Sequence, residues 1–384
     1  MKAVVLAGGE GTRLRPLTCN LPKPMVPLLN RPFLERLLLR LKEHGVGEVA
    51  LALSYLPEVV KARFGDGDGL GVRLFYPQEE RPLGTAGAVK NWASHLDGAF
   101  FVFNGDIFTD LDLGEVLRFH REKQAKATIV LTPVEDPTAY GVVEMDPSGR
   151  VKRFVEKPPA DQVNSRWVNA GTYVLEPEVL QYIPAGQHSM FERGLFPLLV
   201  DMGIPVYGYP SQAYWLDLGT PRNYLQVHRD LLQWGSSSIG GPNVVGPRSP
   251  FRPDGEMVQE GVWAGTGCRI APDVRFKQPV ALGPGCVVES GAQVLGPAVM
   301  GAHCTVGAGA VVDGALLWDR VQVGAGATLT RCIIASGVVV GAGVTVGRDC
   351  ILADGVVVEE GNHLGEGVVL WPGKRLEVGS LTRA

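Results

Sequence analysis

The chain has 384 residues, of which 45% are hydrophobic and 20% charged, and its formal net charge is -4 at pH 7. This length is too great for one ordinary hydrophobic core and predicts two or three domains, and the apolar content excludes an intrinsically disordered chain. Because a weak negative charge gives no general attraction to polyanions, we expect no nucleic acid and no membrane among the main partners.

The amino-terminal segment lacks the pattern of a secretion signal. Its apolar run ends at Gly8 and Gly9, and no other run reaches the length that a membrane span requires. The six cysteines include no C-x-x-C pair and are too few for a secreted disulfide framework, so they should be reduced. We therefore expect a cytoplasmic protein.

Residues 1–235 alternate between short apolar runs and segments with helical spacing. Strands are expected over Lys2–Ala7, Glu48–Leu53, Val72–Tyr76 and Ala99–Phe103, and helices over Phe33–His44, Pro57–Phe64 and Thr85–His95. A last helix should begin at the N-cap Thr220 and end at Gly235. This order predicts an α/β, Rossmann-like domain with a mostly parallel sheet, which binds ligands beyond the carboxyl ends of its strands.

The pattern changes after a Gly- and Pro-rich linker, placed at 236–257. From Val258 to Leu370 an apolar residue recurs every six residues, with a five-residue step before Leu317 and another before Ile334. Hexapeptide periodicity is typical of a parallel β-helix in which three short strands make each coil, so a β-helix is predicted over 258–375, followed by a C-terminal tail over 376–384.

Three of the cysteines lie 18 residues apart, at Cys268, Cys286 and Cys304. An 18-residue coil would place them in one interior column, continued by Val321 and Val338 once the short steps are counted. Small buried side chains explain this column without a metal, so we interpret the cysteines as structural.

The segment after the first strand has the composition of a phosphate-binding loop. Three glycines allow backbone amides to approach a phosphate chain, and arginines add fixed positive charge. The loop lacks the Gly-Lys-Ser/Thr of a Walker A motif and the third glycine of a dinucleotide-binding motif. Its candidate nucleotide-binding residues are Leu6, Ala7, Gly8, Gly9, Gly11, Thr12 and Arg13.

A lysine between two prolines follows this loop, at Lys23. Prolines restrict the backbone, so Lys23 would be a rigidly mounted cation for a phosphate group.

These two motifs together, Gly-Gly-x-Gly-Thr-Arg-Leu-x-Pro-Leu-Thr and Lys-Pro-Met-x-Pro, resemble those of the sugar-1-phosphate nucleotidyltransferases. The resemblance extends over nearly the whole chain. It implies that the chain joins a sugar 1-phosphate to the α-phosphate of a nucleoside triphosphate, with Mg²⁺, and releases pyrophosphate. It also implies that the β-helix winds left-handed.

The resemblance implies a role for further residues. Asp106 and Asp217 match the metal-binding positions, and with Arg13 and Lys23 they are the expected catalytic residues. Gln78, Gly84 and Thr85 occupy the place where the family reads the base. The expected sugar-phosphate site comprises Gly141, Glu156, Lys157, Asn169 and Thr172.

The segment Leu83–Gly87 and the ending Leu370–Lys374 most resemble mannose-1-phosphate guanylyltransferases, which implies GTP and mannose 1-phosphate as substrates. Three alternatives stay open: a glucose-1-phosphate thymidylyltransferase, a bifunctional enzyme whose β-helix also transfers acetyl groups, and a non-catalytic relative. An acetyltransferase needs a general base, and the candidates His303 and His363 are expected at exposed coil turns. Stacked repeats favour self-association, so we expect a homo-oligomer.

Overall fold

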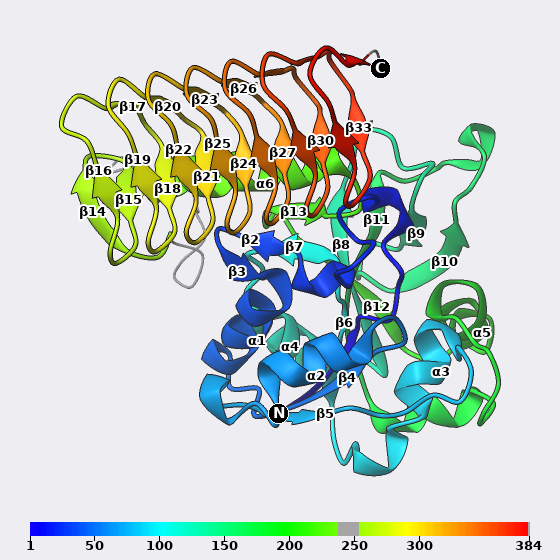
Figure 1. Cartoon of the computed structure of the whole chain (residues 1–384). Coiled ribbons are helices and arrows are strands. Elements are labelled where there is room, and N and C mark those ends of the chain that lie inside the picture. Colours follow the sequence, from blue (N-terminus) through cyan, green and yellow to red (C-terminus); the bar gives the residue numbers. More distant parts are fainter. Residues whose placement is uncertain (237–252, 383–384) are drawn as a thin grey trace. The chain divides into compact units, whose positions relative to one another are not determined.

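The computed structural model describes residues 1–236 and 253–382 (Figure 1). The chain divides into two compact units. The first comprises Met1–Gly9 and Leu37–Asp217, and the second comprises Glu10–Arg36 and the chain from Leu218 onward. Among the described residues, every helix is too short or too polar to cross a lipid bilayer.

A nine-stranded sheet forms the centre of the first unit. Its strands are β1 (Lys2–Leu6), β4 (Glu48–Ala52), β5 (Arg73–Phe75), β6 (Phe100–Asn104), β8 (Ala127–Pro133), β9 (Gly141–Met145), β10 (Val151–Glu156), β11 (Trp167–Leu175) and β12 (Val206–Pro210). The strands follow the order β10-β9-β11-β6-β1-β4-β5, and β8 pairs with β11 and β12. The four strands expected from the sequence are β1, β4, β5 and β6, and they form its parallel part.

The other part of this sheet is largely antiparallel, whereas the sequence predicted a mostly parallel sheet. Strand β11 runs antiparallel to β6, β8 and β9, and β9 runs antiparallel to β10. Aromatic rings fill the space beneath it: Tyr173 of β11 is fully buried and lies 5.4 Å from Phe191 and 5.0 Å from Phe196 between ring centroids. The mixed sheet therefore carries a second group of strands beside the parallel half.

Helices and short helical turns connect these strands. They are α1 (Phe33–Glu43), α2 (Pro57–Phe64), η3 (Asp68–Leu70), α3 (Gly84–Lys90), η4 (Ala93–His95), α4 (Leu113–Glu122), η5 (Ala160–Gln162), η6 (Pro177–Tyr182), η7 (Phe191–Leu195) and α5 (Phe196–Asp201). The helix expected over Thr85–His95 is interrupted: α3 ends at Lys90, and the turn η4 follows.

Helix α6 (Pro221–Ser236) and the segment Glu10–Arg36 belong to the second unit. The segment contains the turns η1 (Thr12–Leu14) and η2 (Lys23–Met25) and the two-stranded sheet of β2 (Pro27–Leu28) and β3 (Arg31–Pro32). As expected, Thr220 caps α6, because its Oγ1 accepts a hydrogen bond from the backbone N–H of Asn223 at 3.2 Å. The hydroxyl of Tyr224 on α6 donates to the carbonyl oxygen of Pro27.

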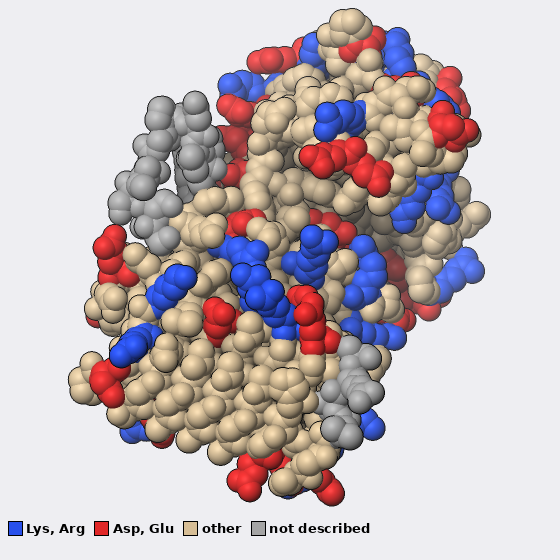
Figure 2. All heavy atoms as spheres, turned by 90° about the horizontal axis from the view of Figure 1, so that it is seen from above, with Lys and Arg blue, Asp and Glu red and all other residues tan. Residues whose placement is uncertain are grey.

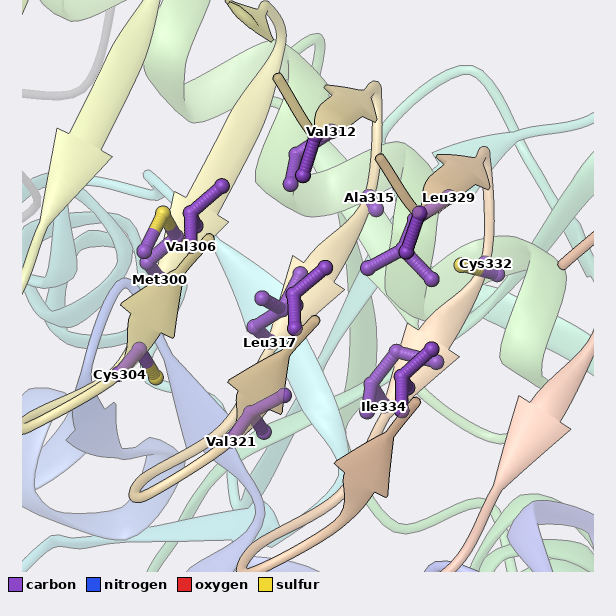
Figure 3. Close-up of a cluster of buried hydrophobic side chains, with 14 of the residues drawn as sticks. Met300, Cys304, Val306, Val312, Ala315, Leu317, Val321, Leu329, Cys332 and Ile334 are labelled. Atoms are coloured by element: carbon purple, nitrogen blue, oxygen red, sulfur yellow. The ribbon is translucent and has the colours of Figure 1, made fainter. Parts of the chain in front are cut away.

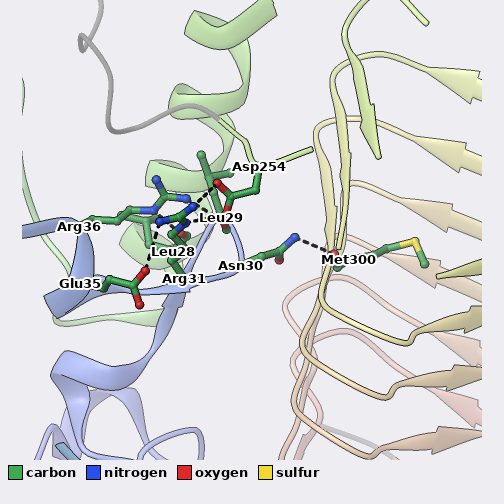
Figure 4. A network of polar contacts seen from close by, with 8 residues as sticks. All are labelled: Leu28, Leu29, Asn30, Arg31, Glu35, Arg36, Asp254 and Met300. Carbon is green, nitrogen blue, oxygen red and sulfur yellow. Dashed lines mark hydrogen bonds and ion pairs between the residues drawn. The ribbon is translucent and has the colours of Figure 1, made fainter. Parts of the chain in front are cut away.

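Polar contacts join Glu10–Arg36 to the rest of the second unit (Figure 4). The guanidinium of Arg31 makes two hydrogen bonds to the carboxylate of Asp254, at 2.6 and 2.8 Å. The side-chain amide of Asn30 donates to the backbone oxygen of Met300 at 2.9 Å. This segment is therefore held by a carboxylate that precedes β14 and by a backbone group of the β-helix.

Three parallel sheets make up the β-helix. The first continues from β15 (Val262–Ala264) through β18 (Val280–Leu282), β21 (Ala298–Met300), β24 (Leu316–Leu317), β27 (Ile333–Ile334) and β30 (Ile351–Leu352) to β33 (Val369–Leu370). The second contains β16 (Arg269–Ile270), β19 (Val287–Val288), β22 (Thr305–Val306), β25 (Gln322–Val323), β28 (Val339–Val340), β31 (Val357–Val358) and β34 (Arg375–Leu376). The third contains β17 (Arg275–Lys277), β20 (Gln293–Leu295), β23 (Val311–Asp313), β26 (Thr328–Thr330), β29 (Thr345–Val346), β32 (His363–Leu364) and β35 (Leu381–Thr382).

The interior of the β-helix confirms the repeat and the cysteine column. Apolar residues at the hexad positions point inward, as Figure 3 shows for Met300, Leu317 and Ile334. The backbone N–H of Thr305 bonds to the oxygen of Val321 and that of Gln322 to the oxygen of Val338, so the column continues as expected across the short step. The described cysteines are free, and burial raises the pKa of the Cys332 thiol.

The ends of the β-helix differ from the expected boundaries. Val258 does not begin a coil: it lies in β14 (Glu256–Gln259), which runs antiparallel to β15, and its side chain is exposed. At the other end β34 and β35 extend the coils into the expected tail. Of the expected linker 236–257, residues 237–252 lie outside the described residues.

Candidate active site

The two aspartates expected to bind metal lie at one edge of the first unit. Strand β6 ends at Asn104, and Asp106 follows after Gly105. The next strand, β7 (Ile107–Thr109), pairs antiparallel with β13 (Trp215–Asp217), and Asp217 is the register partner of Ile107. The backbone pairing therefore brings Asp217 beside the neighbour of Asp106, although 110 residues separate them in the sequence.

The connection before Asp106 requires a residue without a side chain. The backbone N–H of Gly105 donates to the carbonyl oxygen of Leu6 at 2.8 Å, and a Cβ at Gly105 would lie 2.8 Å from the same oxygen. This close approach fixes the end of β6 against the end of β1. The phosphate loop begins at that same end of β1.

The donor set at this edge fits Mg²⁺, which is bound by few protein oxygens and keeps several waters. No group of three or more His, Cys, Asp or Glu in the described part of the chain could hold a metal, so any site here rests on two carboxylates. Asn104 adds a buried side-chain oxygen, Oδ1, that lacks a hydrogen-bond partner among the described residues.

The nearby Asp110 and Asp112 have structural roles. Asp110 accepts a hydrogen bond from the backbone N–H of Tyr214 at 2.7 Å, and Asp112 caps α4 by accepting from the N–H of Glu115 at 3.1 Å. Neither carboxylate needs a metal to explain its position.

A cavity of about 230 Å³ lies beside the first half of the phosphate loop, within the first unit. Five of the expected nucleotide-binding residues line it: Leu6, Gly8, Gly9, Gly84 and Thr85. Ala7 is buried, and its N–H bonds to the oxygen of Ala52. Gly9 faces open space, whereas a Cβ at Gly8 would meet the hydroxyl oxygen of Ser54 at 2.7 Å.

The second half of the loop belongs to the second unit. Gly11 has the left-handed conformation, φ 65°, and precedes the turn η1, which contains Thr12 and Arg13. A Cβ at Gly11 would lie 3.0 Å from the Cβ of Lys23, so the loop packs closely against the lysine turn η2. These contacts place Arg13 and Lys23 on adjoining turns of one segment, while Arg15 pairs with Glu10 at 2.8 Å.

The expected base-binding residues divide between two cavities. Gln78 does not line the cavity beside Gly8; it lines another of about 390 Å³, and both cavities share Leu53, Ser54, Glu79 and Pro82. The carboxylate of Glu79 accepts a hydrogen bond from the N–H of Leu83 at 3.1 Å. No sequence motif marks Glu79, because an acidic residue in a loop is usually a solvated one.

The first residues of α3, which begins with Gly84 and Thr85, contact the segment around Ser189. The amides of Ala86 and Gly87 both donate to the carbonyl oxygen of Ser189, at 3.0 and 3.1 Å, so these groups are occupied within the protein. Thr85 Oγ1 donates to the carboxylate of Glu192 at 3.1 Å. Glu192 was also missed, since no motif marks it and only the fold brings η7 to α3.

The expected sugar-site residues lie on adjacent antiparallel strands. Gly141 is the register partner of Glu156, and a Cβ at Gly141 would lie 2.9 Å from Glu156 Oε2. Lys157 follows with φ 50°, and its N–H donates to the oxygen of Tyr140 at 2.9 Å. Its ammonium group lies 4.0 Å from Glu156 Oε1.

Burial raises the pKa of the Glu156 carboxyl, and the negative charge of Glu192 raises it further, whereas Lys157 and Arg193 act in the opposite direction. Of the other two expected residues, Asn169 donates through Nδ2 to the hydroxyl of Tyr173 at 2.8 Å, and Thr172 is buried on β11. The first unit thus gathers all five expected sugar-site residues on β9, β10 and β11 or directly after β10.

The two histidines considered as bases for acetyl transfer are both exposed, but one lies at a coil turn and the other in a strand. His303 lies at a coil turn with φ 57°, as expected, but His363 lies in strand β32 rather than at a turn.

Comparison with known proteins extends over both parts of the chain. Residues 2–234 match the nucleotidyl transferase family, and residues 259–364 match the left-handed β-helix domain of the EIF2B epsilon subunit. A mannose-1-phosphate guanylyltransferase of Mycobacterium tuberculosis is 42% identical over 71% of this chain and 77% of its own length. A UTP–glucose-1-phosphate uridylyltransferase of Synechocystis is 38% identical over 64% of this chain and 66% of its own length.

A solved structure, that of HddC from Yersinia pseudotuberculosis complexed with GMP-PN, superposes with a TM-score of 0.51 at 29% identity, over 59% of this chain and 97% of the other. The family match covers more than half of the sequence and includes every residue assigned to the site. The chain therefore belongs to the nucleotidyl transferase family, as its motifs predicted.

Proposed function

We propose that this protein transfers GMP from GTP to mannose 1-phosphate, forming GDP-mannose and releasing pyrophosphate. The pairing of Asp217 with Ile107, next to Asp106, is the observation that carries the chemical part of the proposal. It provides two carboxylates at the end of β6, where the loop glycines Gly8 and Gly9 line a cavity. The 42% identical mannose-1-phosphate guanylyltransferase of Mycobacterium tuberculosis supports the choice of substrates.

In the proposed reaction, a phosphate oxygen of the sugar 1-phosphate attacks the α-phosphorus of GTP, and the bond to the pyrophosphate leaving group breaks. The attacking oxygen is already an anion, so no general base is needed. The protein must bring two anions together and stabilise the charge at the α-phosphate. We assign Arg13 and Lys23 to the leaving pyrophosphate and Lys157 to the sugar phosphate.

Asp106 and Asp217 would hold Mg²⁺, which when bound neutralises phosphate charge. Glu156 on β10 accepts hydrogen bonds from sugar hydroxyls in this proposal, and Asn169 and Thr172 lie on β11. Gly84, Thr85 and Gln78 remain the candidate base-binding residues.

Glu79 supports GTP as the nucleotide. Glu79 lines the cavity beside Gly8 and Gly9. Guanine presents two neighbouring donors, the N1–H and the 2-amino group, which a carboxylate can accept together, whereas uracil and thymine present one.

The relative that uses UTP and glucose 1-phosphate gives a specific reason to compare substrates. Pyrophosphate release should be measured with each of GTP, dTTP, UTP, CTP and ATP, combined with mannose or glucose 1-phosphate. We expect the highest kcat/KM for GTP with mannose 1-phosphate. A preference for dTTP or UTP with glucose 1-phosphate would overturn the substrate assignment and leave the reaction type intact.

We further propose that the enzyme acts in the cytoplasm as a homo-oligomer assembled through its β-helix, without nucleic acid. The repeated coils and the exposed Val369 and Trp371 near the last coils support self-association. Light scattering of the purified protein tests this: a monomer at micromolar concentration would contradict it.

A further inference from the structure

A cavity of about 290 Å³ lies in the second unit, between α6 and the turns of the β-helix. Four arginines line it, two from each side: Arg222 and Arg229 from α6, and Arg331 and Arg348 from successive coils. Residues seven apart on a helix share a face, so both helix arginines belong to the side of α6 that borders the cavity.

The two arginines of the β-helix come from stacked turns. The N–H of Arg331 donates to the oxygen of Asp313 at 2.7 Å, and the N–H of Asp349 donates to the oxygen of Arg331 at 3.0 Å. Arg331 has φ 44° and Asp349 has φ 57°, a conformation that Gly314 takes in the preceding coil with φ 60°.

The positive charge of the cavity is not balanced by its own carboxylates. Asp349 and Glu366 also line it, so guanidinium groups exceed carboxylates by two. Throughout residues 1–236 and 253–382, none of the four arginines forms an ion pair within 4.0 Å, and Arg229 donates only to Gln226 Oε1, at 3.3 Å. Like charges that converge without partners repel one another, and a bound anion would remove that cost.

Figure 2 shows Lys and Arg side chains gathered along one border of the regularly ridged, mostly uncharged face of the β-helix. We propose that the arginine-lined cavity binds a small phosphate-bearing anion with at least two negative charges, such as pyrophosphate or a sugar bisphosphate. Guanidinium groups match phosphate oxygens through paired hydrogen bonds. The cavity volume suits a ligand of this size rather than a polymer.

Isothermal titration of the full-length protein with inorganic pyrophosphate, without Mg²⁺, tests the proposal. Four proteins should be compared: the wild type, the double variant Arg331→Gln/Arg348→Gln, the variant Arg320→Gln and the variant Lys23→Ala. Arg320 is the matched control, because it too is an exposed β-helix arginine with positive φ, 58°, but does not line the cavity.

We expect the double variant to lose one class of pyrophosphate site, with affinity weaker by about 10- to 100-fold, while Arg320→Gln binds as the wild type does. Lys23→Ala should keep this class and lose the other, which separates the cavity from the proposed catalytic site. Titration with glucose 1,6-bisphosphate then shows which class of ligand the cavity prefers. Tighter binding of pyrophosphate would indicate a diphosphate, and tighter binding of glucose 1,6-bisphosphate would indicate a sugar bisphosphate. Equal pyrophosphate binding by the wild type and the double variant would overturn the proposal.

Discussion

Asp217 is the register partner of Ile107 in the antiparallel pair of β7 and β13, and this places it beside the residue that follows Asp106. Two carboxylates far apart in the sequence thereby share one edge of the sheet. We expect Asp106→Asn and Asp217→Asn each to lower kcat by about 10²–10³, because each removes charge that holds a phosphate-bound metal. Steady-state rates at saturating substrates provide the measurement.

The matched control for the aspartates is Asp97→Asn, since Asp97 is an exposed residue whose carboxylate forms a surface ion pair with Lys2 at 3.1 Å. Chelation of divalent ions should abolish turnover of the wild type, and added Mg²⁺ should restore it. A folded Asp217→Asn protein with normal turnover and normal Mg²⁺ dependence would refute the metal assignment.

Lys23 lies on a turn between two prolines and against Gly11 of the phosphate loop. Its replacement in Lys23→Ala should lower kcat/KM by about 10²–10³ through loss of a charge on the leaving pyrophosphate. The exposed Lys277 on β17, changed in Lys277→Ala, serves as the control. Comparable rates for the two variants would show that Lys23 does not contact the phosphates.

Gly84 and Gly186 both have positive φ, 72° and 64°, but only Gly84 is crowded. A Cβ at Gly84 would lie 2.6 Å from the carbonyl oxygen of Ser189, whereas at Gly186 it meets nothing within 4 Å. Gly84→Ala should therefore lower the unfolding temperature by several degrees more than Gly186→Ala, at roughly 2–4 °C per kcal/mol, and should also weaken nucleotide binding. Thermal unfolding with and without GTP measures both effects. Equal decreases in unfolding temperature for the two variants would show that the backbone around Ser189 moves to accommodate the added Cβ.

Because the pKa of the Glu156 carboxyl is raised, its ionised form destabilises the folded protein, and the size of this destabilisation depends on pH. Because the folded state disfavours the carboxylate, the cost is present above the folded pKa and is lost as the pH falls through that pKa towards the unfolded value. Glu156→Gln should thus raise the unfolding temperature at pH 7 by roughly 1–2 °C, a small shift because water screens a partly exposed charge. The gain should vanish near pH 4.

The same Glu156→Gln change should reduce sugar binding, because an amide offers a weaker acceptor than a carboxylate, so KM for the sugar 1-phosphate should rise about tenfold or more. Glu122→Gln, at an exposed position of α4, provides the control for both measurements. An unfolding temperature of Glu156→Gln that equals the wild-type value at every pH would contradict the expected linkage.

Leu329 is fully buried in the interior of the β-helix, whereas the side chain of Met257 on β14 is 58% exposed. Leu329→Ala should lower the free energy of unfolding by about 2–5 kcal/mol, since it removes apolar contacts and leaves a cavity between coils. Met257→Ala should change it by about 0.5 kcal/mol or less. Denaturant unfolding followed by circular dichroism distinguishes them, and similar midpoints would indicate that neighbouring coils collapse into the space.

The sequence predicted the β-helix well because its period depends on local geometry. Each hexad fixes one inward residue and one turn, so Leu317 and Ile334 could be placed despite the short steps. The ends were harder, since Val258 keeps the period while pairing antiparallel in β14. The hexad period alone does not reveal which hexads form coils that stack on another coil and which lie beyond the end of the β-helix.

In the first unit, motifs located the glycines and charged residues but not their partners. Glu79 and Glu192 come to α3 and its neighbouring cavity through tertiary contacts that no local pattern encodes. The antiparallel strands were also unassigned; in β8 and β11 nearly every residue is buried, which removes the alternation that identifies strands. What the sequence could not supply was therefore the long-range pairing.

Helix α6 starts four residues after Asp217, and the indole N–H of Trp318 in the β-helix donates to its Tyr224 hydroxyl at 3.1 Å. Tyr224 is almost completely inaccessible to solvent. A shortened protein that stopped at the end of α6 would uncover this aromatic side chain and leave the hydroxyl without its donor. The repeat region thus buries part of α6, and it cannot be regarded as a detachable appendage.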